Sequence, residues 1–162
     1  MEKTYQHILV PLDGSKLSEV SLEEALTLSA LSGAKISLLK VIEPIEDIIK
    51  LDNHSMIYID EQLNGYRRHW LKYLHSIQNG VENKSIKINC VIETGYAPET
   101  IITYAEKHDI DIIVMATHGH SGLKRWVYGS VAEKVLRGAN HPILLVRSYK
   151  EKKKRELSPL YA

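Results

Sequence analysis

The segment at residues 116–130, with the sequence ATHGHSGLKRWVYGS, holds the residue types best suited to binding a phosphate group. Gly119 lacks a Cβ, so the backbone there can turn sharply behind a strand and lie close to a ligand. Gly129 and Ser130 stand where a helix is expected to begin, and the N–H groups of a helix N-terminus attract anions. The same residues also fit a plain loop and a helix cap, because isolated glycine patterns are weakly specific.

Asp13 is a second candidate, because it ends a short apolar run and precedes Gly14 and Ser15. Its carboxylate could hold a ribose hydroxyl or a magnesium ion beside bound phosphates. The alternative is an Asp–Gly turn in which the carboxylate accepts a hydrogen bond from its own backbone.

Four other polar side chains of the 116–130 segment allow weaker interpretations. Lys124 and Arg125 could neutralise phosphate charge or be solvated. His118 and His120 flank Gly119, but no third metal ligand stands at a suitable spacing, so we do not expect a metal site on them. No nucleophile with a base and an orienting group is recognisable, so the sequence predicts at most weak hydrolysis of a bound nucleotide.

The elements that must position these residues alternate along the chain. Short apolar runs rich in branched residues predict strands, and stretches with a helical spacing of apolar residues predict helices. Ser15 is expected to cap the first helix, with Leu22, Ala25, Leu26 and Ser29 on its buried face, and Gly33 to end it. Strands are expected at 7–12, 35–42, 85–92, 111–116 and 142–147, and the later helices at 58–78, 98–108 and 129–137.

Such alternation predicts an α/β fold, with an open, doubly wound parallel sheet of five strands and helices on both faces. Ligands bind such sheets beyond the carboxyl ends of the strands, where the winding reverses. The sequence predicts one domain over residues 1–149 and a charged, disordered tail at 150–162 that begins KEKKKR.

Composition bounds the setting in which the protein works. The chain has 162 residues, 44% of them hydrophobic and 25% charged, and a formal net charge of +1. No global charge favours nucleic acid or a membrane surface, and no apolar run is long enough to span a bilayer. The single cysteine, Cys90, excludes an internal disulfide. The expected compartment is therefore the reducing cytoplasm.

Several segments together resemble the universal stress protein (UspA-like) family, in its nucleotide-binding branch. The closing segment is similar to that family's signature, G-x-x-G, nine residues, then G-S/T, and it continues through Gly129–Leu136 into the strand His141–Arg147. Val10–Ser15 is similar to the family's first strand and turn. Ala97–Glu99 and Asp111–Met115 match its later elements. The resemblance extends over roughly residues 5–149.

The resemblance implies a sheet of strand order 3-2-1-4-5 that binds ATP, with Mg²⁺ held by Asp13. It implies a homodimer formed through strand 142–147, acting as a regulator in a stress response. Val41 matches a position whose main chain contacts adenine. The implied nucleotide-binding residues are Pro11, Asp13, Val41, Met115, Ala116, Gly119, Gly129, Ser130 and Val131.

Ala116 is the one departure, because it stands where the signature has its first glycine. If that position needs a left-handed backbone, alanine weakens binding; if it needs only a small residue, alanine is tolerated. Because Ala116→Gly restores the family's glycine, we expect it to raise ATP affinity by up to about tenfold. We expect binding to be retained. The alternatives are an interaction protein whose pocket is disabled, and a slow ATPase.

Overall fold

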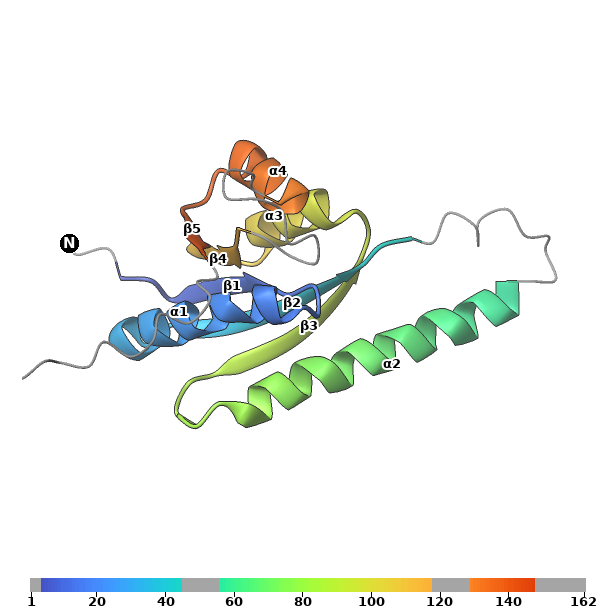
Figure 1. Cartoon of the computed structure of the whole chain (residues 1–162), viewed down its shortest axis with the longest axis horizontal. Coiled ribbons are helices and arrows are strands. Elements are labelled where there is room, and N and C mark those ends of the chain that lie inside the picture. Colours follow the sequence, from blue (N-terminus) through green and yellow to red (C-terminus); the bar gives the residue numbers. More distant parts are fainter. Residues whose placement is uncertain (1–3, 45–55, 118–128, 148–162) are drawn as a thin grey trace, which may run out of the picture.

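The computed structural model describes residues 4–44, 56–117 and 129–147, and the side chains of the helix at 56–80 from residue 63 onward. The chain forms five strands and four helices in these ranges (Figure 1). They are β1 (His7–Pro11), α1 (Lys16–Ser32), β2 (Lys35–Ile42), α2 (Met56–Gly80), β3 (Ile88–Thr94), α3 (Ala97–Lys107), β4 (Ile112–Ala116), α4 (Ser130–Gly138) and β5 (Ile143–Val146).

The sheet has the order β3-β2-β1-β4-β5, and every pairing in it is parallel. Helices α1 and α2 cover one face, and α3 and α4 lie on the other (Figure 1). The predicted doubly wound α/β fold and its strand order are therefore confirmed. The winding reverses between β1 and β4, which are neighbours in the sheet.

The central strand β1 shows how the core is divided. Ile8 and Val10 pack into the cluster under α1 and α2, whereas Leu9 packs into the cluster under α3 and α4. All three are fully buried. Because side chains alternate along a strand, a strand covered on both faces needs a continuous apolar run.

The predicted buried face of α1 does face the core, but its small residues Ala25 and Ser29 are buried more deeply than its leucines Leu22 and Leu26. Ser18, Ser21 and Ser29 are buried beside Ala25, whereas the leucines only partly pack against the core. Ser21 Oγ donates to the Ser18 carbonyl at 2.7 Å, and Ser29 Oγ donates to the Ala34 carbonyl at 2.6 Å. Small side chains with satisfied hydroxyls let the helix lie close to the sheet.

Both ends of α1 follow the sequence prediction. Ser15 caps the helix by accepting from the Ser18 N–H, and Gly33 ends it with a φ of 74°. Strand β3 differs, because it begins at Ile88 and not at Ser85. Asn83 accepts a hydrogen bond from the Ser85 N–H at 3.1 Å, and that side-chain turn replaces the first strand residues.

A buried polar network closes the amino end of the sheet. The His7 side chain lies with Nδ1 3.0 Å from the His108 carbonyl, and its Nε2 lies 2.8 Å from Ser37 Oγ. The carbonyl can only accept, so Nδ1 carries the hydrogen and Nε2 accepts from the hydroxyl. Burial is the largest influence on His7, and it lowers the pKa of the imidazole from 6.5.

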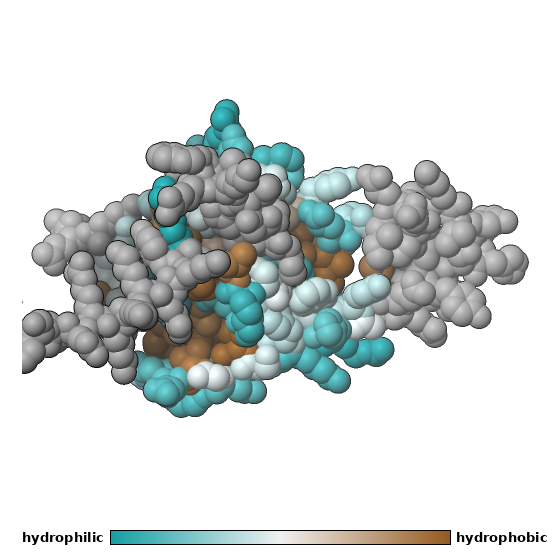
Figure 2. Space-filling view, viewed as in Figure 1, coloured by the Kyte–Doolittle hydropathy of each residue, from teal (hydrophilic) through white to brown (hydrophobic). Residues whose placement is uncertain are grey.

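Hydrophobic surface is exposed between α1 and the C-terminal end of α2 (Figure 2). The groove there is lined by the apolar side chains of Leu22, Leu26, Ile77, Val81 and Ile86.

Within the described ranges, none of the helices has the length and apolarity needed to cross a membrane.

Candidate functional site

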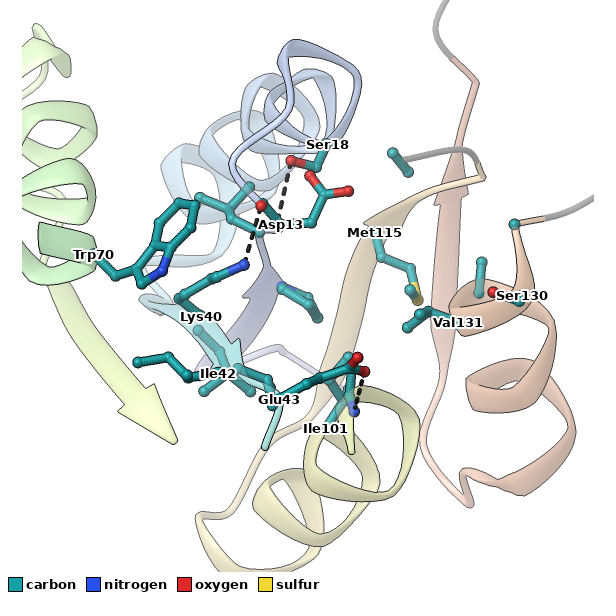
Figure 3. A pocket seen from close by; sticks show the side chains of 18 of the residues that line it. Asp13, Ser18, Lys40, Ile42, Glu43, Trp70, Ile101, Met115, Ser130 and Val131 are labelled. Atoms are coloured by element: carbon teal, nitrogen blue, oxygen red, sulfur yellow. Dashed lines mark hydrogen bonds between the residues drawn. The ribbon is translucent and has the colours of Figure 1, made fainter. Parts of the chain in front are cut away.

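A pocket of about 650 Å³ opens at the carboxyl ends of β1, β2 and β4 (Figure 3). Its walls come from these strand ends, the turn after β1, the overhanging face of α2, and the first turns of α3 and α4. The winding of the sheet reverses between β1 and β4, and crevices at such points are the usual ligand sites of open α/β sheets. Of the residues predicted for the site, Pro11, Asp13, Val41, Met115, Ala116, Gly129, Ser130 and Val131 line it.

Val41 presents its backbone to this pocket because β2 is longer than β1. The Leu39 carbonyl accepts from the Leu12 N–H at 2.8 Å, so the backbone groups of Leu39 point toward β1. Groups two residues apart on a strand point the same way, so those of Val41 point to the side where β1 has already ended. On the other side, the Ile42 carbonyl accepts from the Gly95 N–H at 3.0 Å. The main-chain role implied for Val41 therefore has a geometric basis.

Asp13 makes the turn that its sequence position allowed, and its side chain also lines the pocket. Its Oδ1 accepts from the Ser15 N–H at 2.8 Å, which makes the expected turn. The half-buried side chain also lines the pocket, between the Lys40 side and the Met115 side (Figure 3). The turn bond fixes the carboxylate at the mouth of the pocket.

The first turn of α4 lies opposite Asp13. The helix begins at Ser130 with Gly129 as its N-cap, and the Gly129 carbonyl accepts from the Glu133 N–H at 2.9 Å. The N–H groups of Ser130, Val131 and Ala132 precede that first helical bond, so they have no partner within the helix. They and the helix dipole favour an anion at this end of the pocket.

Neither Gly129 nor Ala116 has a left-handed backbone. Gly129 has a φ of −58°, and its N–H donates to the Thr117 carbonyl at 2.6 Å. Ala116 is the last residue of β4, buried and paired with Val146. Among the described residues outside glycine, only Asp109 has a positive φ. Of the two requirements considered for residue 116, a left-handed conformation therefore does not apply to this chain.

Some predicted residues lie outside the described part of the chain. These are Gly119 with the neighbouring His118, His120, Lys124 and Arg125, and the tail at 150–162. Among the residues that are described, no group of three or more His, Cys, Asp or Glu side chains could hold a metal ion.

Sequence reasoning missed the side of the pocket formed by Lys40 and α2. Trp70 lines the pocket together with Leu63 and Tyr66, and it also packs against the core. Lys40 Nζ lies 4.0 Å from the centre of the Trp70 ring and donates to the Asp13 carbonyl at 3.0 Å. A lysine inside the mainly apolar run ISLLKVI, where it is the single charged residue, was the available signal.

Burial dominates the electrostatics of Lys40. It lowers the pKa of the ammonium group, whereas the carboxylates of Asp13 and Glu43 act to raise that pKa. Glu43 is itself engaged, because its Oε1 accepts from the Ala97 N–H at 3.2 Å at the start of α3. The pocket thus has a cationic side at Lys40 and an anion-attracting helix end at α4.

Comparison with known proteins agrees with this fold. The model of the universal stress protein family matches residues 4–147, so the chain belongs to that family. Universal stress protein MJ0577 of Methanocaldococcus jannaschii is 30% identical over 159 residues, covering 91% of this chain and 98% of that protein. The solved structure of MJ0577 superimposes with a TM-score of 0.79 at 28% identity, over 92% of this chain and all of the other, 100%.

Two more distant solved structures carry nucleotides. One is a universal stress protein in complex with cAMP, with a TM-score of 0.59, 20% identity and coverage of 91% of this chain and 100% of the other. The second is an Arabidopsis thaliana family protein with AMP bound, with a TM-score of 0.59, 17% identity and coverage of 90% and 93%. At these identities the likeness shows a shared fold.

Proposed function

We propose that this universal stress protein binds an adenine nucleotide, ATP with Mg²⁺ in the first place, and works as a homodimeric regulator. One observation carries the proposal. A single pocket brings together outward-pointing backbone groups of Val41, the carboxylate of Asp13 and the N-terminus of α4. A nucleotide needs three corresponding environments, for its base, its ribose or metal, and its phosphates.

The base would lie on the side of Val41. Met115, Ile101 and Ala132 provide a buried apolar wall there, and an aromatic ring gains from leaving water against such a surface. The Val41 N–H and carbonyl offer one donor and one acceptor, which match the polar edge of adenine. Family members with bound cAMP and AMP support an adenine nucleotide as the ligand class.

The phosphates would lie at the first turn of α4. Gly129 leaves room for close approach, and the Ser130 hydroxyl, which is exposed, can donate to a phosphate oxygen. Asp13 lies across the pocket, where it can accept from a ribose hydroxyl or bind Mg²⁺. When bound, Mg²⁺ would neutralise part of the phosphate charge.

The dimer would form through β5. This strand lies at one edge of the sheet, and the backbone N–H and carbonyl groups of its successive residues point alternately to its two sides. The Pro142 carbonyl accepts from the Ile113 N–H of β4, and the Val146 carbonyl accepts from the Thr117 N–H just after β4. Backbone groups of adjacent residues point to opposite sides of a strand, so those of Leu145 point to the outer edge of the sheet. Pairing with β5 of a second copy would satisfy that edge and give a closed two-fold interface.

We place this regulator in the cytoplasm. The lone Cys90 is partly buried, and burial raises the pKa of its thiol, which keeps it protonated and unreactive.

A slow ATPase is the alternative activity, and release of inorganic phosphate at a measurable rate would favour it.

Titration calorimetry with ATP and Mg²⁺ tests the proposal. We expect a micromolar Kd, which corresponds to about −8 kcal/mol. Gly129→Val should abolish binding without unfolding the domain, because the valine branches would occupy the space that a phosphate needs. Gly80→Val is the matched control, since a Cβ at Gly80 would meet no atom within 4 Å and Gly80 does not line the pocket.

Two results would count against nucleotide binding at this site. Absence of heat, together with an unchanged Tm at millimolar ATP, would favour the ligand-free interaction protein. Mass spectrometry of the gently denatured protein would support that result if no nucleotide co-purifies. Unchanged affinity in a folded Gly129→Val variant would place the ligand elsewhere.

A further inference from the structure

The turn between β1 and α1 is held by contacts with Lys40 of β2 and Trp70 of α2. Asp13 and Gly14 form this turn, and Lys40 Nζ donates to the Asp13 carbonyl at 3.0 Å. The Trp70 ring lies against the next residue so closely that a Cβ on Gly14 would come within 2.7 Å of it. Lys40 also lies over the Trp70 ring, 4.0 Å from its centre. Three chain segments far apart in the sequence therefore meet at one turn (Figure 3).

This arrangement stabilises the ammonium group of Lys40. The ion pairs among the described residues are Lys16–Glu19 and Arg137–Glu133, and neither includes Lys40. Its half-buried ammonium group is stabilised by a carbonyl and by the face of an indole ring, and the carboxylates of Asp13 and Glu43 also favour its charged form. A hydrogen bond from a charged donor is stronger than one from a neutral donor, and the attraction of a cation to the face of an indole ring adds to it.

We infer that Lys40 is a positioning residue of the nucleotide site: it holds the Asp13 turn in the binding conformation and, through Trp70, couples that turn to α2. The inference rests on the proposed nucleotide binding. Lys40 acts through the backbone of Asp13, whose side chain faces the other half of the pocket (Figure 3). Movement of the turn on ligand binding must then change the environment of the Trp70 ring.

The geometry also explains why α2 belongs to the site. Its residues Leu63, Tyr66 and Trp70 line the pocket, and Tyr73 further along donates to Glu19 of α1 at 3.0 Å. The helix thus contacts both the turn before α1 and the first turns of α1 itself. A change at the Asp13 turn reaches α2 by these two contacts.

Lys40→Met tests the inference by removing the charge and the donor while keeping an apolar chain. We expect at least a tenfold loss of ATP affinity, the lower bound for one charged hydrogen bond. Lys40→Arg keeps a charged donor and should restore most of the affinity. Lys35→Met is the matched control, because Lys35 lies at the other end of β2, exposed and away from the pocket.

Fluorescence of Trp70 separates positioning from a general loss of stability. In a Trp126→Phe background, Trp70 is the single tryptophan. Because Trp70 lines the pocket, saturating ATP should shift its emission in every variant that binds. Lys40→Met should reduce that shift even when the site is filled, because the turn is then no longer held against the ring. Should Lys40→Met not fold, Lys40→Gln, which retains a neutral donor, is measured instead.

The outcomes are distinct. Equal ATP affinity of the wild type and Lys40→Met would overturn the inference and leave the proposed function intact. A full emission shift in saturated Lys40→Met would overturn the coupling to α2. A wild type that binds no nucleotide would overturn the proposed function itself.

Discussion

Gly14→Ala should destabilise the protein by about 2–4 kcal/mol, because two separate costs meet at this residue. Gly14 has a φ of +95°, and an L-residue held in a left-handed region loses about 1–2 kcal/mol. The added Cβ would lie 2.7 Å and 2.8 Å from two carbons of the Trp70 ring. Forcing an extra methyl group into a packed contact costs about 1–3 kcal/mol. The smaller entropy of the unfolded alanine variant offsets about 0.4–1 kcal/mol.

Urea unfolding of a double-mutant cycle separates the two costs. In a Trp70→Leu background the overlap with the ring is gone, so Gly14→Ala should lose only the backbone part, about 1 kcal/mol. In the wild type the same change should lower Tm by roughly 5–15 °C, at 2–4 °C for each kcal/mol in a chain of this size. Gly80→Ala is the control, since nothing lies near that position.

An equal cost of Gly14→Ala in the two backgrounds would refute the contact between the turn and Trp70. A cost below about 1 kcal/mol in the wild type would also refute the left-handed backbone. In either case the coupling of α2 to the Asp13 turn would lose its structural basis.

Three further expectations concern other parts of the molecule. Ala116→Gly should leave ATP affinity within about twofold of the wild type in calorimetry, because residue 116 ends a regular strand and the left-handed argument for a tenfold gain does not apply; a tenfold gain would show that the alanine methyl obstructs the ligand. Leu145→Pro should convert a dimer into monomers or insoluble protein by removing an outward donor of β5, as light scattering would show, and a monomeric wild type at micromolar concentration would contradict the dimer. The pKa of His7 is lowered by burial, so the unfolded chain binds more protons than the folded one in acid; the free energy of unfolding should fall as pH drops below the ordinary value of 6.5, and His7→Gln should flatten that fall in urea titrations at pH 7 and 5.

Much of the fold was determined by local sequence. Buried strands such as residues 112–116 need continuous apolar runs, and helix ends need particular residues, so Ser15 and Gly33 marked the limits of α1 correctly. The family resemblance supplied the strand order, which then placed the turn at Asp13 beside the end of β4. These features could be predicted because neighbouring residues, or a whole-chain pattern, specify them.

The composition of the pocket was decided by tertiary structure. Lys40 and Trp70 are distant in sequence, and only the packing of α2 against the sheet brings the ammonium group over the ring and onto the Asp13 carbonyl. The backbone of Val41 faces the pocket because β1 pairs with β2 only as far as Leu39, and this register is set by the assembled sheet. Side-chain type shows what chemistry a residue can perform, but the relative lengths and packing of the elements decide which residues meet at one site.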